Sequence, residues 1–156
     1  MNRTDAVAAP WRRNPALIAV GALSALAAFA HLGCIVFGAP WYRALGAGEG
    51  IARAAEAGDP TPALITLPIA AVLALWSLYA LSGAGLVRRL PLLRTALCAI
   101  TAVYLLRGLA LPPVMAAFPG RSAAFWWWSS GICLGIGLVH LVGLIRAWPR
   151  LRSRKA

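Results

Sequence analysis

The sequence predicts an all-α integral membrane protein that folds as a bundle of four transmembrane helices. Four long apolar stretches cover residues 15–38, 62–87, 95–117 and 123–145. Each is near or above the length of about 20 residues that crosses a bilayer core as a helix. Hydrophobic residues make up 61% of the 156-residue chain and charged residues only 12%. A soluble core of this size could not hide so much apolar surface, whereas lipid accommodates it. We therefore predict a single four-helix transmembrane domain over residues 1–156.

The basic residues alternate between the two sides of these stretches, and this alternation predicts the orientation. Eleven of the 15 basic residues lie before the first stretch, between the second and third, or after the fourth: Arg3, Arg12, Arg13, Arg88, Arg89, Arg94, Arg146, Arg150, Arg152, Arg154 and Lys155. The opposite loops carry fewer basic residues, together with acidic ones: Arg43, Arg53, Arg121, Glu49, Glu56 and Asp59. The positive-inside rule places both termini in the cytoplasm. Residues 146–156 then form a basic cytoplasmic tail.

The net charge of +11 indicates membrane lipids as partners rather than nucleic acid. In a soluble protein such an excess favours nucleic-acid binding. Here the basic residues flank apolar spans, where they attract anionic lipid headgroups. We therefore predict no nucleic-acid partner. The small size and the composition rich in Ala, Arg and Gly are typical of a multi-pass protein of a bacterial inner membrane.

The first span and the loop after it carry several local features. Arg12 and Arg13 precede an apolar run, as in a cleavable signal sequence, but this run continues through Phe37 and is too long for one. We therefore predict a retained helix. Trp41 and Tyr42 follow directly, as expected at an outer membrane interface. Within the long outer loop, residues 48–58 predict a short helix with charges spaced to pair along one side.

The later spans contain turn and packing motifs. The short turn around Pro91 makes spans two and three antiparallel neighbours, and Pro112-Pro113 must bend or end span three. Phe125 and the three tryptophans after it form a second outer aromatic girdle. Gly131-x-x-x-Gly135 permits close approach of another helix, so this face is a candidate contact for a second copy or a membrane partner.

Three cysteines lie inside the spans, at Cys34, Cys98 and Cys133. We interpret them as packing residues, and a Cys34–Cys133 disulfide stays an open alternative.

Arg107 is the most informative single residue. It lies thirteen residues beyond Arg94, about 20 Å along a helix, and hence in the outer half of the bilayer. An arginine at a span centre costs about 2.5–3.5 kcal/mol on insertion scales, so it needs a partner, a wet cavity or access to the interface. We interpret it as an anchor for an anion or a polar headgroup. The alternatives are a snorkelling arginine and an ion pair with Glu49 or Glu56.

Other polar residues lie at the same depth and complete a predicted outward-facing pocket. The predicted ligand-binding residues are Arg107, His31, Tyr104, Glu49, Ser129, Ser130 and Thr66. His140 lies toward the inner side without evident polar neighbours, and we interpret it as a packing residue. These placements follow from depth along each span and not from the direction in which a side chain faces.

The sequence favours a non-enzymatic function. It has no His pair with an acid for a metal, no phosphate-binding glycine loop and no nucleophile elbow. We predict no catalytic residues, no metal and no cofactor. The spans contain no Asp or Glu, which weakens both hydrolysis and proton-coupled transport. The leading hypothesis is binding of a lipid-like or amphiphilic ligand, or of a membrane partner, around Arg107. The alternatives are a subunit of an oligomeric transporter or channel, and a small enzyme acting on lipid or quinone with His31 and Arg107 in its site.

Overall fold

The computed structural model describes residues 13–110 and 123–152, and every regular element in those ranges is a helix. Three of the helices are long and apolar enough to cross a membrane: α1 (Pro15–Phe37), α4 (Thr61–Gly83) and α7 (Ala123–Arg152). Three are shorter: α2 (Ala39–Ala44), α3 (Glu49–Glu56) and α5 (Leu93–Leu109). The predicted all-helical fold is thus confirmed for this part of the chain, and its three longest helices have the length and composition of membrane spans.

Local sequence determines where α1 begins and ends. The Asn14 side chain accepts a hydrogen bond from the backbone N–H of Leu17 at 3.3 Å, and Pro15 occupies the first turn, where its missing N–H costs nothing. At the other end Gly38 adopts a φ of 71°, a backbone conformation that stops a helix and favours glycine. Helix α2, which was not predicted from the sequence, begins at the next residue, Ala39, with Pro40 in its first turn. The aromatic pair after span one is therefore part of a separate short helix.

The later helices differ from the predicted spans in their limits. Helix α4 ends at Gly83 rather than at residue 87, because a turn begins there with Gly85 at a φ of 80°. Helix α5 ends at Leu109, and the rest of predicted span three, with Pro112-Pro113, lies outside the described residues. Helix α7 continues to Arg152, so residues 146–152 of the predicted tail are helical. Ala147 and Leu151 are buried in the core, which explains why the helix extends so far.

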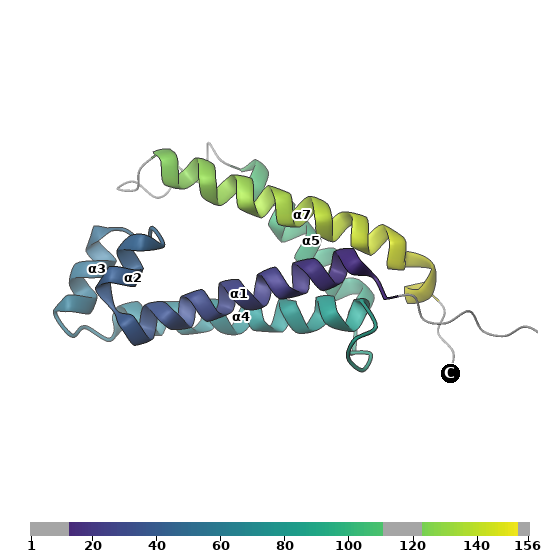
Figure 1. Cartoon of the computed structure of the whole chain (residues 1–156), viewed down its shortest axis with the longest axis horizontal. Coiled ribbons are helices and arrows are strands. Elements are labelled where there is room, and N and C mark those ends of the chain that lie inside the picture. Colours follow the sequence, from purple (N-terminus) through teal and green to yellow (C-terminus); the bar gives the residue numbers. More distant parts are fainter. Residues whose placement is uncertain (1–12, 111–122, 153–156) are drawn as a thin grey trace, which may run out of the picture.

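The four longest helices pack as two pairs. Helix α1 lies along α4, and α5 lies along α7 (Figure 1). The pairs meet most closely at the end where α1 begins and α7 finishes, and there the main core forms around Leu17, Val20, Leu97 and Leu144. Figure 1 shows α1 and α7 diverging toward the opposite end, where α2 and α3 stand. A second, smaller core at that end packs Tyr42 of α2 with α3 and the end of α1.

Glycines set the spacing between α5 and α7. A Cβ atom added at Gly108 would lie 2.8 Å from the backbone of Leu134, and one at Gly137 would lie 3.0 Å from the backbone nitrogen of Leu105. No larger side chain fits at either position without moving a backbone, so these two glycines bring the helices together. Gly131 and Gly135, by contrast, have nothing within 4 Å of an added Cβ. Their shared face is therefore not used for packing inside the described chain.

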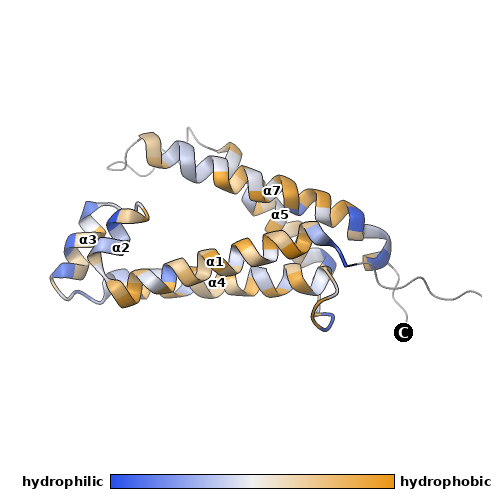
Figure 2. Ribbon diagram, in the orientation of Figure 1, coloured by the Kyte–Doolittle hydropathy of each residue, from blue (hydrophilic) through white to orange (hydrophobic). Residues whose placement is uncertain are grey.

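The outer surface of the long helices is apolar. Figure 2 shows hydrophobic residues along the helices and hydrophilic ones concentrated at the two ends. Leu26, Phe29 and Trp128 are 66%, 69% and 75% exposed. A soluble protein rarely leaves so many large apolar side chains uncovered, whereas contact with acyl chains satisfies them. This distribution of exposed apolar side chains is consistent with a membrane protein.

Candidate functional site

The residues that the sequence analysis grouped into one pocket lie in four separate places. Arg107 of α5 is half-buried and donates hydrogen bonds to two hydroxyl groups of α7, from Nη2 to Ser129 Oγ at 2.8 Å and from Nη1 to Ser130 Oγ at 2.9 Å. Its guanidinium carbon lies 5.3 Å from the centre of the Trp126 ring. Neutral hydroxyls and an aromatic face therefore hold this cation.

Glu49 and Glu56 bond to other arginines and not to Arg107. Arg43 of α2 donates to both, with Nη1 2.7 Å from Glu56 Oε1 and Nη2 2.9 Å from Glu49 Oε1. Arg53 also donates to Glu49, at 3.2 Å. The hydrogen bonds from Arg43 lower the pKa of Glu49 from its ordinary 4.5 to about 2, and they lower the pKa of Glu56 as well. This network joins α2 to α3 at the surface.

His31 and Thr66 line a cavity of about 380 Å³ beneath that network, which we call the outer cavity. Its walls come from α1, α2, α3 and α4, and Phe125 of α7 closes one side. Most of the lining is apolar, with Ile65 and Ile69 among the larger side chains. Tyr42 donates its hydroxyl hydrogen to Thr66 Oγ1 at 3.2 Å, which ties α2 to α4 across the cavity.

The protonation pattern of His31 follows from its neighbour. Nδ1 lies 2.7 Å from the carbonyl oxygen of Ala27, and a carbonyl can only accept, so Nδ1 carries the hydrogen. In the neutral ring Nε2 is then a hydrogen-bond acceptor. The outer cavity thus offers one imidazole, the Tyr42 hydroxyl and the Thr66 hydroxyl within an apolar surround. Such a mixture suits a ligand with an apolar body and a small polar head.

Tyr104 belongs to the fourth place, in the interior between the helix pairs. Its hydroxyl lies 3.0 Å from Ser24 Oγ of α1, and its ring packs edge-on against Trp76 at 5.0 Å between centres. His140 of α7 is nearby, 6.4 Å away between ring centres. Tyr104 does not line the outer cavity. It contributes instead to a buried polar group inside the bundle.

His140 is a residue whose polar surroundings the sequence analysis missed. It is 1% exposed, and Nδ1 lies 2.8 Å from Thr101 Oγ1. Thr101 gives its only hydroxyl hydrogen to the carbonyl of Leu97 at 2.7 Å, so His140 must be the donor in the pair. Nε2 is then a buried acceptor, without a hydrogen-bond partner among the described residues. The signal available in the sequence was Thr101, a polar residue of span three at the same depth as His140. Depth alone, however, does not show which side chains face each other.

Comparison of the chain with protein-family models, with curated proteins and with solved structures finds no match in any of the three. Within residues 13–110 and 123–152 no three His, Cys, Asp or Glu residues come close enough to hold a metal ion. Cys34, Cys98 and Cys133 are all free thiols. Among the places described above, the outer cavity is the one that combines a concave volume with several polar side chains.

Proposed function

We propose that this protein spans the membrane four times, with both termini in the cytoplasm, and binds an amphiphilic, lipid-like ligand in the outer cavity. The distribution of charge supports this topology. The start of α1 and the α4–α5 turn are joined by a hydrogen bond from Asn14 N to the Ala84 carbonyl at 3.4 Å, and Arg89 donates to the carbonyl of Leu151 at 3.1 Å. Three basic segments thus gather at one end, which the positive-inside rule assigns to the cytoplasm. The composition favours a bacterial inner membrane.

The observation that carries the proposed function is the outer cavity itself. Its volume of about 380 Å³ falls within the range of known small-molecule sites, which is about 300–1,000 Å³. Its walls are mainly apolar, and its polar groups are His31, Tyr42 and Thr66. We assign the apolar body of the ligand to the apolar part of the lining, which includes Ile65 and Ile69. The polar head lies against His31 and the hydroxyl groups.

In this proposal Arg107 is an accessory anchor for the head of the ligand. It does not line the outer cavity. Phe125 does, and it lies four residues before Ser129 on α7, so the two share one face of that helix. The serine-bound guanidinium of Arg107 therefore belongs to the α7 side of the same end of the bundle. We assign it to a ligand whose anionic head extends beyond the outer cavity on the α7 side.

The enzyme alternative required His31 and Arg107 to converge on one cavity. Among the described residues the outer cavity includes His31 without Arg107, and Glu49 is engaged by Arg43 at the surface. A proton-transfer pair between these residues is therefore not supported. Binding requires no such convergence, and we favour it for that reason.

We also propose that the face of α7 formed by Gly131 and Gly135 contacts a second helix, either from another copy of this chain or from a membrane partner. The specific support is the open space beside both glycines, in contrast to the tightly packed Gly137. An oligomer formed through this face would also be the route to the transporter or channel alternative.

Filling the outer cavity tests the proposed function. Ala30 lines the cavity, so Ala30→Phe would occupy the space in which the ligand lies. Ala22, exposed on the same helix and outside the lining, gives the matched control Ala22→Phe. We expect the wild-type protein and the control, purified in mild detergent, to carry the same amphiphile by mass spectrometry of the extract, and Ala30→Phe to lose it. Retention of that amphiphile by correctly folded Ala30→Phe would refute binding in the outer cavity.

A further inference from the structure

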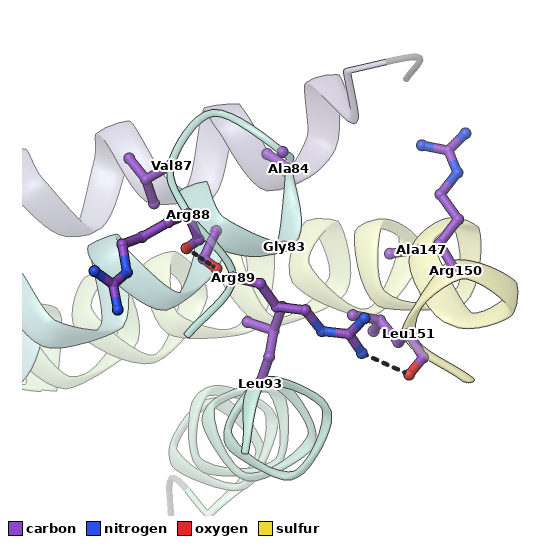
Figure 3. A pocket seen from close by; sticks show the side chains of 11 residues that line it. Gly83, Ala84, Val87, Arg88, Arg89, Leu93, Ala147, Arg150 and Leu151 are labelled. Carbon is purple, nitrogen blue, oxygen red and sulfur yellow. Dashed lines mark hydrogen bonds between the residues drawn. The ribbon is translucent and has the colours of Figure 1, made fainter. Parts of the chain in front are cut away.

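A second cavity lies at the opposite end of the molecule, where the basic segments gather. It has a volume of about 390 Å³ and is formed by the α4–α5 turn, the start of α5 and the end of α7. We call it the inner cavity. Figure 3 shows its lining, which includes the arginines Arg88, Arg89 and Arg150 together with small and apolar residues. The proposed function of the outer cavity makes no use of this place.

The turn that forms one wall is held by specific hydrogen bonds. Ser82 Oγ donates to the carbonyl of Arg88 at 2.9 Å and accepts from the backbone N–H of Leu90 at 3.1 Å. Gly85 allows the chain to reverse through its φ of 80°. One buried hydroxyl thus holds both ends of the segment that carries Arg88 and Arg89. The arginine backbones are positioned by the fold and do not depend on a ligand.

The side chains of the three arginines take different directions. Nη2 of Arg89 donates to the carbonyl of Leu151 at 3.1 Å, so its guanidinium reaches the end of α7 (Figure 3). Arg150 projects from α7 itself, while the guanidinium of Arg88 points away from Leu151. Arg89 and Arg150 both line the α7 side of the inner cavity, but their guanidinium groups point in different directions (Figure 3), so the exposed Arg150 side chain has to turn toward Arg89 for the two to share a ligand. Arg88 contributes its carbonyl to the turn.

The rest of the described lining is uncharged and, apart from Ser82, made of apolar residues and glycines. Ala84, Leu93, Ala147 and Leu151 are all buried and supply the floor. Among the described residues the lining has no acidic side chain, and Glu49 and Glu56 belong to α3, at the other end of the bundle. A cationic rim above an apolar floor, at the cytoplasmic side of a membrane protein, has the character of a site for anionic lipid headgroups.

We propose that the inner cavity binds a phosphate group, with Arg89 and Arg150 as its ligands. Guanidinium groups suit phosphate because their planar N–H donors match its oxygens and can bond in pairs. The phosphate belongs to an anionic phospholipid or to a soluble phosphate compound, since both present the same oxygens to the arginines. With a lipid, the glycerol and first acyl carbons lie against Leu93 and Leu151.

The test uses the full-length protein in detergent, with phosphatidylglycerol as the probe and native mass spectrometry as the readout. Arg89→Gln and Arg150→Gln each remove one proposed ligand. Arg146→Gln removes the same charge from an exposed position of α7 outside the lining. Loss of a charge-assisted hydrogen bond should weaken binding about five- to tenfold in the first two variants and less than twofold in the control. Circular dichroism and elution volume report whether each variant is folded.

Inorganic phosphate, added as a competitor, distinguishes the two sources. Displacement of phosphatidylglycerol by inorganic phosphate would identify a soluble phosphate as the ligand, and persistence of the lipid adduct would identify a phospholipid. Unchanged lipid binding in both Arg89→Gln and Arg150→Gln would overturn the proposal. So would an equal loss in Arg146→Gln, because it would show a general effect of charge. If Arg89→Gln does not fold, because its bond to Leu151 is lost, Arg150→Gln and its control decide the question.

Discussion

Arg43 of α2 holds Glu49 of α3 through two hydrogen bonds, from Nε to Oε2 and from Nη2 to Oε1, both at 2.9 Å. The same guanidinium donates to Glu56, about two helical turns farther along α3. A lysine could not make this forked contact. Because α2 and α3 both contribute to the lining of the outer cavity, this clamp controls how firmly the cavity is covered. The first prediction concerns the conditions under which the clamp opens.

We expect the clamp to be lost in acid between pH 4.5 and about pH 2. The hydrogen bonds from Arg43 lower the pKa of Glu49 from 4.5 to about 2, so the ionised carboxylate is favoured in the folded state. A carboxyl group whose pKa is lower in the folded protein than in the unfolded chain stabilises the folded state. For Glu49 this stability is fully present above pH 4.5 and is lost as the pH falls through the folded-state pKa of about 2. Glu49 and Glu56 are the only glutamates in the chain, so selective ¹³C labelling gives two carboxyl resonances to titrate.

In Arg43→Gln both resonances should titrate closer to 4.5, and hydrogen exchange of the α3 amides should accelerate at neutral pH. The long helices should keep their protection, because the clamp is exposed and lies outside the main core. Wild-type glutamates that both titrate near 4.5 would contradict a clamp held by Arg43.

The second prediction concerns Arg107 and its two serines. Replacing Ser129 and Ser130 with alanine leaves the half-buried guanidinium without the two acceptors that hold it. We expect a loss of about 1–3 kcal/mol in the free energy of unfolding, measured by a steric-trap assay in bicelles. Thr95→Ala, at an exposed position of α5, is the control and should change the free energy by less than about 0.5 kcal/mol. A double variant as stable as the control would show that Arg107 finds equivalent partners elsewhere.

The third prediction concerns the buried pair of Thr101 and His140. Thr101→Val removes the acceptor for the Nδ1–H group of His140 and should destabilise the protein by about 1–3 kcal/mol. His140→Leu removes the buried ring nitrogens altogether. The double variant should lose less than the sum of the two single variants, since no polar group is then left without its partner. Strictly additive losses would mean that the hydrogen bond contributes nothing to stability.

The fourth prediction separates glycines that form the fold from those proposed to form an interface. Gly131→Leu with Gly135→Leu should leave folding intact, because open space surrounds both positions, and should abolish self-association measured by photobleaching in liposomes. Gly137→Leu should instead disrupt the α5–α7 contact, because Leu105 lies against that glycine. Monomers in the wild-type protein, or unchanged oligomers in the double variant, would exclude this face as the self-contact.

Local features of the sequence were enough to predict the first helix almost to the residue. Asn14, Pro15 and Gly38 act on their own backbone, and the apolar run between them has the length of a span. The same reasoning did not predict α2, because it interpreted Trp41 and Tyr42 only as residues of the membrane interface, whereas both lie in a helix that begins directly after Gly38. Helix α7 extends beyond the predicted end of its span because Ala147 and Leu151 pack into the main core, and no local sequence pattern predicts that contact.

The predicted pocket shows the limit of the same reasoning. Residue counts along each span give depth, and depth alone assigned His31, Tyr104 and Arg107 to one site. The rotation of each helix instead directs them to the outer cavity, to Ser24 and to the serines of α7. That rotation depends on contacts between helices, such as the approach of Gly137 to Leu105.

Sequence alone determined the helical class, the apolar spans and the gathering of charge at their ends, because these properties depend on neighbouring residues and on the solvent around them. Only the tertiary structure decided which polar side chains meet, which glycines pack against a neighbouring helix and where the cavities lie. These depend on residues far apart in the chain, as with His140 and Thr101, which are separated by 39 positions and joined by one hydrogen bond.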